Sequence, residues 1–319
     1  MGMLSRLLGF DRNKDMAELL PVIERAVSKV EPLLKQTSGY PEIYHKPATV
    51  ALEYVRSLAA SVPGPVVINR ESYARNPFVH ALFPSLDFVL DAFSASRALR
   101  DYRSEFPDSG EIYALMGMRR WEKSMMGMEL SGHVIQHDVP QNMVYFTSHT
   151  IENPAPSEKQ AREQVIWSLF DSLVSKVAKR VGERKLKKLS QLQEKDALMA
   201  RLRAADTQAR PALEKELSRV VAGMQATVRS LDLRNYIEDF EAVLLNPEQH
   251  LRLDQTSIIL DRMGIRRDSE DVNQGESVTF NDLIGFDRRN WTVTMVCCSN
   301  MQSESFAARL ETAYRTLAI

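Results

Sequence analysis

The chain of 319 residues contains only two cysteines, Cys297 and Cys298, and they are adjacent. A disulfide framework needs several spaced cysteines, so small disulfide-stapled proteins are excluded. On a strand, neighbouring side chains point to opposite faces, so these two thiols can neither chelate one ion nor form an unstrained disulfide. We therefore expect two small buried residues and a reducing, cytoplasmic location.

The familiar catalytic and cofactor motifs are also absent. The sequence has no G-x-x-x-x-G-K-[ST], no G-x-G-x-x-G after a strand, and no G-x-S-x-G, H-E-x-x-H or paired C-x-x-C. No apolar run reaches the roughly 18 residues that a membrane span needs. We expect no cofactor and no membrane-spanning segment, and the sequence identifies no reaction.

The net charge of −1 conceals an uneven distribution along the chain. Residues 175–231 hold 14 basic and 6 acidic side chains, a net charge of +8, which leaves −9 for the remainder. The stretch 236–276 has the opposite character, with ten acidic residues against four basic ones. Such polarity indicates either an oriented partner or contact between the two segments.

Helical patterns dominate the first third of the chain, and we predict a helical N-terminal region over residues 1–108. Asp15 is suited to cap a first helix, and Pro47 suits the first position of the next. Another helix is expected to begin near Ser85, after Pro84, with its apolar residues on one face. Pro107 and Gly110 close the region.

Alternating patterns with hairpin turn residues predict strands in two separate segments. The first segment, 109–156, is expected to contain strands near 111–119, 122–130, 133–139 and 143–151. A tight turn at Ser131-Gly132 and a three-residue loop at Pro140 to Asn142 would connect them. The second segment, 232–319, is expected to contain a helix near 234–247, strands at 251–266, 277–286 and 290–299, and a final helix over about 306–317.

Each strand segment is small alone, whereas together they make a normal sheet. We therefore predict one discontinuous α+β body with a mostly antiparallel sheet, and two separate small sheets are the alternative. Methionines crowd the first strands, at positions 116, 118, 125, 126, 128 and 143. Methionine occurs at adaptable binding surfaces, but filling of the core is the favoured interpretation.

Between the strand segments, residues 157–231 predict a long antiparallel coiled-coil hairpin. Leu169, Leu173, Val177 and Val181 are spaced by fours, and Leu186, Leu189 and Leu192 are expected to continue the apolar seam. The second helix, restarted at Pro211, carries a cleaner stripe that includes Leu213, Leu217, Val220, Met224 and Val228, close to a heptad. No aromatic residue occurs between Phe170 and Tyr236, so these helices are not expected to surround a core.

The first hypothesis for function is a non-enzymatic adaptor that binds a protein partner, or a second copy of itself, through this arm. Helix-face recognition needs only an apolar stripe and charges that set orientation. The predicted partner-binding residues are Lys179, Arg180, Arg184, Lys185, Lys187, Lys188, Leu213, Leu217, Val220 and Met224. The alternative is a nucleic-acid-associated factor whose basic arm contacts phosphates, although no aromatic residues for base stacking interrupt the basic run.

A second alternative is an enzyme with an unrecognised site. If the loop at 140–142 forms, His133 falls directly opposite His149, close enough for the two rings to share a metal ion. Two ligands do not complete a site, so ordinary strand histidines are the favoured interpretation. His80 lies among apolar neighbours in "NPFVHALF", where a hydrogen-bonded core histidine is expected.

Overall fold

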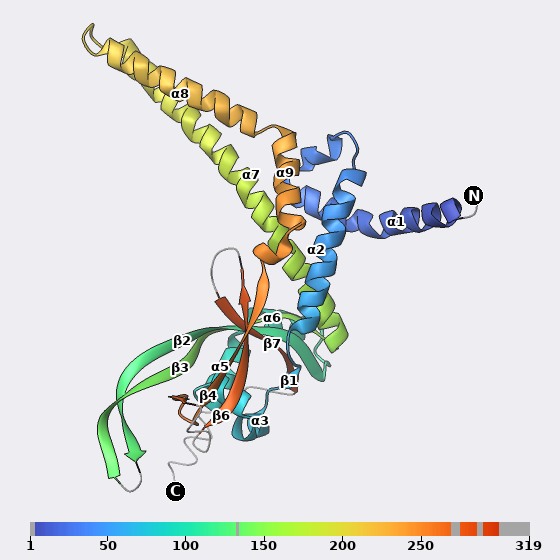
Figure 1. Cartoon of the computed structure of the whole chain (residues 1–319), viewed down its shortest axis with the longest axis vertical. Helices are drawn as coiled ribbons and strands as arrows, with labels where there is room; N and C mark the ends of the chain where they lie inside the picture. The colour runs from blue at the N-terminus through green and yellow to red at the C-terminus, as the bar shows by residue number, and fades with distance from the viewer. Residues whose placement is uncertain (1–3, 132–133, 269–274, 286–289, 300–319) are drawn as a thin grey trace. The chain divides into compact units, whose positions relative to one another are not determined.

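A computed structural model describes residues 4–131, 134–268, 275–285 and 290–299 of the chain (Figure 1). The chain divides into two compact units: unit 1 comprises residues 1–56 and 168–250, and unit 2 comprises residues 57–167 and 251–319. Helices and an antiparallel sheet together make an α+β protein, which confirms the predicted fold class.

The described part of unit 1 is helical. Its elements are α1 (Leu4–Val30), the 3-10 turn η1 (Pro32–Gln36), α2 (Glu42–Ser61), α7 (Glu158–Ala204), α8 (Arg210–Ser230), α9 (Leu233–Leu244) and the 3-10 turn η2 (Pro247–Gln249). Helices α2 and α7 continue across the unit boundaries, so the last residues of α2 and the first of α7 belong to unit 2.

Apolar faces of α1, α2, α7 and α9 supply most of the buried residues of unit 1. The ring of Tyr44 on α2 packs edge-on against Phe240 of α9, with ring centroids 5.0 Å apart. Both rings are fully buried, so the pair contributes both area and a specific aromatic geometry. A bidentate ion pair from Arg25 to Asp171, with N–O distances of 2.8 and 2.7 Å, joins α1 to α7.

Unit 2 is built on a seven-stranded sheet. Its strands are β1 (Val66–Val67), β2 (Glu111–Ser131), β3 (Val134–Ala155), β4 (Arg252–Leu260), β5 (Arg266–Arg267), β6 (Glu276–Ile284) and β7 (Asn290–Ser299). The order is β3-β2-β7-β6-β4-β5, all antiparallel, and β1 adds to β7 in parallel. Because β2 pairs with β7, the two sequence segments form one sheet, and the alternative of two separate sheets is wrong.

The predicted division of the first segment into four strands is wrong. Strands β2 and β3 are continuous and pair along their length, from Tyr113 opposite Ala155 to Ser131 opposite Val134. The expected loop at 140–142 does not form, because Pro140 is paired opposite Met126 within β3. Proline has no backbone N–H and is tolerated in edge strands, which have a neighbouring strand on one side only. Strand β3 is at the edge of the sheet, so Pro140 can be accommodated there.

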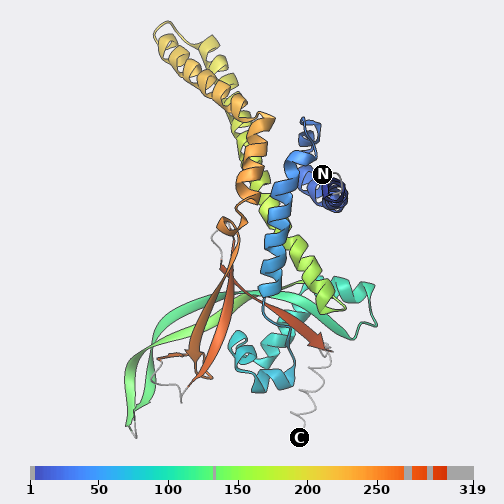
Figure 2. The ribbon, with the colours of Figure 1, turned by 45° about the vertical axis from the view of Figure 1, so that its right-hand side comes forward.

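Three irregularities bend the β2–β3 ribbon. The register shifts at three places, and at each one β3 carries a residue with positive φ: Asp138, Ser148 and Asn153. Bulges of this kind increase local twist and interrupt the row of unpaired backbone groups on an edge strand. The ribbon therefore curves (Figure 2), and its open edge is a poor template for pairing with another strand.

The methionines of β2 divide into two groups. Met116 and Met118, where β2 lies inside the sheet, are buried as expected for core residues. Met125, Met126 and Met128 lie where β2 has passed beyond β7, and they are exposed. The interpretation as core filler is therefore right only for the part of β2 that has strands on both sides.

Four short helices pack on the sheet of unit 2: α3 (Arg70–Arg75), α4 (Pro77–Leu82), α5 (Leu86–Ala95) and α6 (Arg97–Glu105). Each begins at a side chain that accepts a hydrogen bond from the first turn, and Ser85 caps α5 as the sequence predicts. Val79, Phe93 and Leu99 from these helices meet Phe280 and Val296 from the sheet in one core.

Three polar side chains form a hydrogen-bonded cluster that joins three strands of this sheet. Arg120 on β2 donates to Asp282 on β6 at 2.8 Å, and Thr292 on β7 donates to the other oxygen of Asp282 at 2.6 Å. The Arg120 guanidinium also lies over the ring of Phe280, 5.7 Å from its centroid. Three neighbouring strands are thus held in register by one satisfied carboxylate.

The predicted segment boundaries, 1–108, 109–156 with 232–319, and 157–231, follow changes in element type. The compact units follow contact density instead, and they cut through α2 and α7. The segment boundaries therefore remain a prediction. The predicted final helix over 306–317 lies outside the described residues.

Candidate functional site

Helices α7 and α8 form an antiparallel hairpin, the most distinctive feature of unit 1 (Figures 1 and 2). Helix α7 has 47 residues, which corresponds to a length of about 70 Å at 1.5 Å per residue. The turn between the helices is fixed by Asp206, whose side chain accepts from the backbone N–H groups of Gln208 and Ala209 at 3.1 and 2.8 Å.

Within unit 1, the part of α7 up to Arg184 is much more buried than the part after it. The first part contributes Leu169, Phe170, Leu173, Val174, Val177 and Val181 to the core of unit 1. Beyond Arg184, Leu198 is the one buried residue of α7. We use the name outer hairpin for residues 186–228, which include this second part of α7, the turn and nearly all of α8.

A thin apolar seam holds the outer hairpin together. Leu198 of α7 is buried against Leu213 and Val220 of α8, and Leu202, Leu217 and Met224 pack around them. The predicted apolar residues of α8 are therefore brought together, and they face α7. Within the closed hairpin these side chains are engaged, and their role in binding a partner remains a prediction.

Two leucines that were expected in the seam lie outside it. Leu186 and Leu189 are 65% and 56% exposed. Gln191, by contrast, contacts α8: its amide lies 3.2 Å from where a side chain would begin at Gly223. At 100° per residue, Leu186 and Leu189 are turned about 140° and 160° away from Gln191, so they point away from α8.

Helix α8 also exposes apolar side chains. Val221 and Val228 are exposed, and Val228 was predicted to continue the stripe. Both lie about 80° to 100° around the helix from the buried Val220. The contact between Gln191 and Gly223 sets Leu186 of α7 level with Val228 of α8, so the four exposed apolar residues lie at neighbouring levels of the hairpin.

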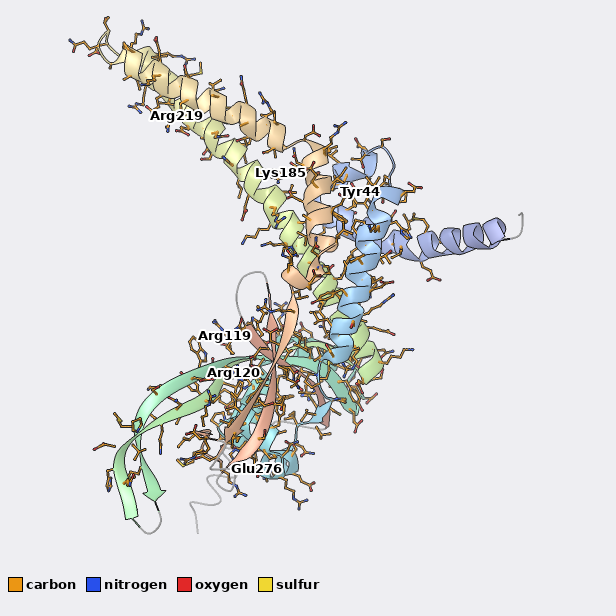
Figure 3. All side chains as sticks on the ribbon, in the orientation of Figure 1. Tyr44, Arg119, Arg120, Lys185, Arg219 and Glu276 are labelled. Carbon is orange, nitrogen blue, oxygen red and sulfur yellow. The ribbon has the colours of Figure 1, made fainter. Side chains whose placement is uncertain are left out.

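Part of the basic run is neutralised within unit 1. Arg184 forms an ion pair with Asp239 of α9 at 2.6 Å, and Arg180 lies 3.6 Å from the same carboxylate. Lys185, beside α9 in Figure 3, pairs with Glu31. Asp239 belongs to the acidic stretch of the sequence, so contact between the two oppositely charged segments is confirmed at these residues.

The remaining basic residues of the predicted set differ among themselves. Lys179 is exposed but has an interaction of its own. Lys187 and Lys188 are exposed and have no ion pair with any residue that the structure describes. Of the six predicted basic residues, these two are thus the ones available to an acidic or phosphate-bearing partner.

The predicted pairing of His133 with His149 is not supported. His133 lies outside the described residues, and the loop at 140–142 that would have placed it opposite His149 does not form. The ring of His149 packs against Phe83 and Phe88, and its Nε2 lies 2.9 Å from the carbonyl oxygen of Leu82. Within the described part of the chain, no group of three or more His, Cys, Asp or Glu side chains could hold a metal ion.

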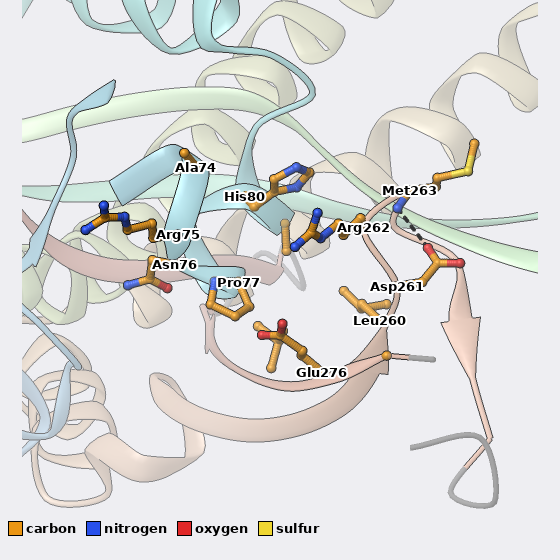
Figure 4. Close-up of a pocket in the computed structure, with 13 residues that line it drawn as sticks. Ala74, Arg75, Asn76, Pro77, His80, Leu260, Asp261, Arg262, Met263 and Glu276 are labelled. Carbon is orange, nitrogen blue, oxygen red and sulfur yellow. Dashed lines mark hydrogen bonds between the residues drawn. The ribbon is translucent and has the colours of Figure 1, made fainter. Parts of the chain in front are cut away.

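Unit 2 contains a pocket that sequence reasoning missed. It has a volume of about 450 Å³ and lies between α3–α4 and the ends of β4 and β6 (Figure 4). His80 lines it, stacked on Tyr73 with ring centroids 5.1 Å apart. No signal in the sequence could have found this pocket, because the residues that line it come from positions 74–81, 260–263 and 275–278, which are distant in the chain.

A rigid turn forms one wall of the pocket. The Asp261 side chain accepts from the backbone N–H groups of Met263 and Ile265 at 2.8 and 2.9 Å, and its other oxygen accepts from Arg267 at 2.8 Å. Gly264 has φ +75° and approaches Val144 so closely that a Cβ would lie 2.8 Å from its carbonyl oxygen. Asp261 is thus saturated, and the turn holds Arg262 at the pocket.

No family model matches the chain, and neither a curated protein nor a solved structure does. In the described residues, no helix is both long enough and apolar enough to cross a membrane.

Proposed function

We propose that this protein is a non-enzymatic interaction protein that uses the outer hairpin to bind a protein partner. The observation that carries the proposal is the exposure of Leu186, Leu189, Val221 and Val228 on a hairpin with a thin seam of its own. In a helical hairpin with no binding role, apolar residues are expected in the seam between the helices and polar residues on the exposed faces. Exposed apolar side chains that cluster on a surface are typical of a binding site.

The chemistry of these residues favours a particular kind of partner. Leu186 and Leu189 offer an apolar contact one helical turn long, and the exposed Lys187 and Lys188 lie between them in the sequence. The complementary surface is an apolar patch bordered by carboxylates. Self-association through the same surface is disfavoured, because residues 186–228 hold 8 basic and 5 acidic side chains, so two copies would bring together hairpins that each carry a charge of +3.

The nucleic-acid alternative has less support from the same contacts. Three of the six predicted basic residues, Arg180, Arg184 and Lys185, already pair with Asp239 and Glu31. Binding through Lys187 and Lys188 alone would give a logarithmic salt slope of about −1.8, whereas proteins with six to ten phosphate contacts have slopes several times steeper. The enzyme alternative near His133 and His149 no longer has the hairpin geometry that motivated it.

A pair of double variants tests where the partner binds. Leu186→Ser with Leu189→Ser removes the apolar contact, and Lys187→Glu with Lys188→Glu reverses the charge. All four positions are exposed, so each double variant is expected to change the free energy of unfolding by less than about 1 kcal/mol. Each is expected to weaken capture of the partner by at least about tenfold, or about 1.4 kcal/mol.

Arg201→Glu with Arg203→Glu is the matched control, because it makes the same charge change at exposed positions nearer the turn of the same helix. We expect it to retain the partner. Full binding by both test variants would refute the proposal. Equal loss in the control would replace it with a diffuse electrostatic interaction, and sensitivity of the complex to nuclease would identify nucleic acid.

We also propose a cytoplasmic location. Cys297 and Cys298 are both free thiols and both buried, as expected for small core residues in a reducing compartment. Localisation of a fluorescently tagged chain in its native cell tests this, and enrichment outside the cytoplasm would refute it.

A further inference from the structure

The pocket of unit 2 presents two opposite charges that do not pair with each other. Arg262 and Glu276 both line it, from the β4–β5 turn and from the start of β6. Their side chains extend toward the same space, with Pro77 and Leu260 beside it (Figure 4). Neither forms an ion pair with any residue that the structure describes, although an opposite charge faces each across one cavity.

Other charges at the pocket are already satisfied. Arg75 pairs with Glu71 at 2.7 Å, and its guanidinium is turned away from Arg262 in Figure 4. Asp261 accepts from two backbone N–H groups and from Arg267. The charges that remain for a ligand are therefore one guanidinium and one carboxylate.

One part of the remaining lining is suited to an apolar group. Pro77, Ala81, Leu260 and Val278 contribute to it, and Val278 and Leu260 are buried beneath the surface. Gly275 packs closely against β4, because a Cβ there would lie 2.8 Å from Ile259 and 3.0 Å from the Leu260 carbonyl oxygen. The volume of about 450 Å³ lies within the range of small-ligand pockets.

We propose that this pocket binds a free α-amino acid with an apolar side chain. Arg262 receives the carboxylate, Glu276 receives the ammonium group, and the side chain lies against Leu260, Val278 and Pro77. A guanidinium binds a carboxylate through two parallel hydrogen bonds, and an ammonium group donates to a carboxylate in a similarly charge-assisted bond. This binding function belongs to unit 2 and is independent of the outer hairpin in unit 1.

Calorimetric titration of the full chain tests the ligand class. The probes are L-leucine, L-methionine and L-phenylalanine, each up to about 10 mM, which covers weak metabolite binding. L-leucine methyl ester lacks the carboxylate, and N-acetyl-L-leucine lacks the ammonium group. We expect at least one free amino acid to bind and both blocked forms to bind at least about tenfold more weakly.

Two single variants test the residues. Arg262→Gln and Glu276→Gln change exposed side chains, so the fold is expected to persist. Each is expected to weaken binding at least about tenfold. Arg70→Gln and Glu105→Gln make the same charge changes at exposed positions that do not line the pocket, and they are expected to bind normally.

Three results would overturn the proposal. The first is no binding by any of the three free amino acids. The second is equal binding by the ester or the acetylated form, which would indicate a peptide terminus or an unselective apolar site. The third is unchanged affinity in both pocket variants, which would place the ligand elsewhere.

Discussion

Replacing Leu198 by Ala is expected to loosen the outer hairpin without loosening the sheet of unit 2. Leu198 is 3% exposed and is one of three buried residues in the seam, with Leu213 and Val220. Complete burial of a residue of this size contributes about 1.5–3 kcal/mol, so the three together contribute about 6 kcal/mol before entropy is subtracted. Loss of one therefore removes a large share of what holds the two helices together.

The expected magnitude is about 2 kcal/mol in the free energy of local opening. Leucine-to-alanine changes in cores cost about 2–5 kcal/mol, and the lower end applies where neighbouring side chains can collapse into the space. The seam has a single layer, with half-buried Leu202 and Met224 beside it, so collapse is easy. Hydrogen exchange of backbone amides from α7 and α8 should then accelerate by about 30-fold.

Hydrogen exchange measured by mass spectrometry separates the possible outcomes. Peptides that cover residues 191–224 should exchange faster in Leu198→Ala, whereas peptides from β7 should be unchanged. Met199→Ala is the matched control, because Met199 is the next residue and is exposed; we expect a change of less than about threefold. Unchanged exchange in Leu198→Ala, or equal acceleration in β7, would show that the hairpin is not held by a separate thin seam.

Three further predictions concern unit 2. In the intact pair the side chain of Asp282 is 9% exposed and that of Arg120 is 18% exposed, so Asp282→Ala leaves Arg120 buried without its partner. We expect it to lower the free energy of unfolding, measured in urea, by about 3 kcal/mol. The double variant Asp282→Asn with Arg120→Met should cost less, and the reverse order would contradict the role of the pair. Burial lowers the pKa of His149 below 6.5, so its full contribution to stability is present above pH 6.5 and is lost as the pH falls through the folded pKa. His149→Gln should therefore weaken the loss of stability on acidification, measured by urea unfolding between pH 7.5 and 5.5. Burial also lowers the pKa of His250, which accounts for a separate part of this loss. An unchanged pH profile in His149→Gln would count against burial as the cause. Burial raises the pKa of the Cys298 thiol to about 12. A thiol reagent at pH 8 should therefore leave Cys298 unreacted in the native chain and modify it in urea. Rapid labelling of Cys298 in the native chain would refute this burial.

Local signals in the sequence predicted some helix starts and missed others. The starts predicted at Asp15 and Pro47 are wrong, because α1 (Leu4–Val30) and α2 (Glu42–Ser61) run through these residues. Ser85 was predicted to begin a helix because a serine after a proline can satisfy the first N–H groups, and it caps α5. The alternation at 290–299 marked β7, and the two sequence segments were joined in one sheet because neither could bury a face alone. The oppositely charged segments do meet, at Arg180, Arg184 and Asp239.

The failures arise where a residue's meaning depends on its neighbours in space. Pro140 was interpreted as a loop residue, because the sequence does not show that β3 lies at the edge of the sheet, where proline is tolerated. Leu186 and Leu189 were predicted to lie in the seam because leucine is usually buried between paired helices. In the structure Gln191 faces α8, so the two leucines lie on the opposite side of α7 and are exposed. Arg262 and Glu276 are ordinary charged residues until the fold of β4 and β6 brings them to one pocket.

Affinity capture from native cells tests the central claim most directly. Three forms should be compared: the intact chain, Leu186→Ser with Leu189→Ser, and a chain lacking residues 186–228 in which Lys185 is joined to Arg229 by a short turn. Gln191 contacts Gly223, so residues 185 and 229 lie at the same level and the shortened hairpin can close. The proposed function predicts a nuclease-resistant protein partner that the intact chain captures and both altered forms lose. Capture of the same partner by all three forms would show that the outer hairpin is not the binding surface.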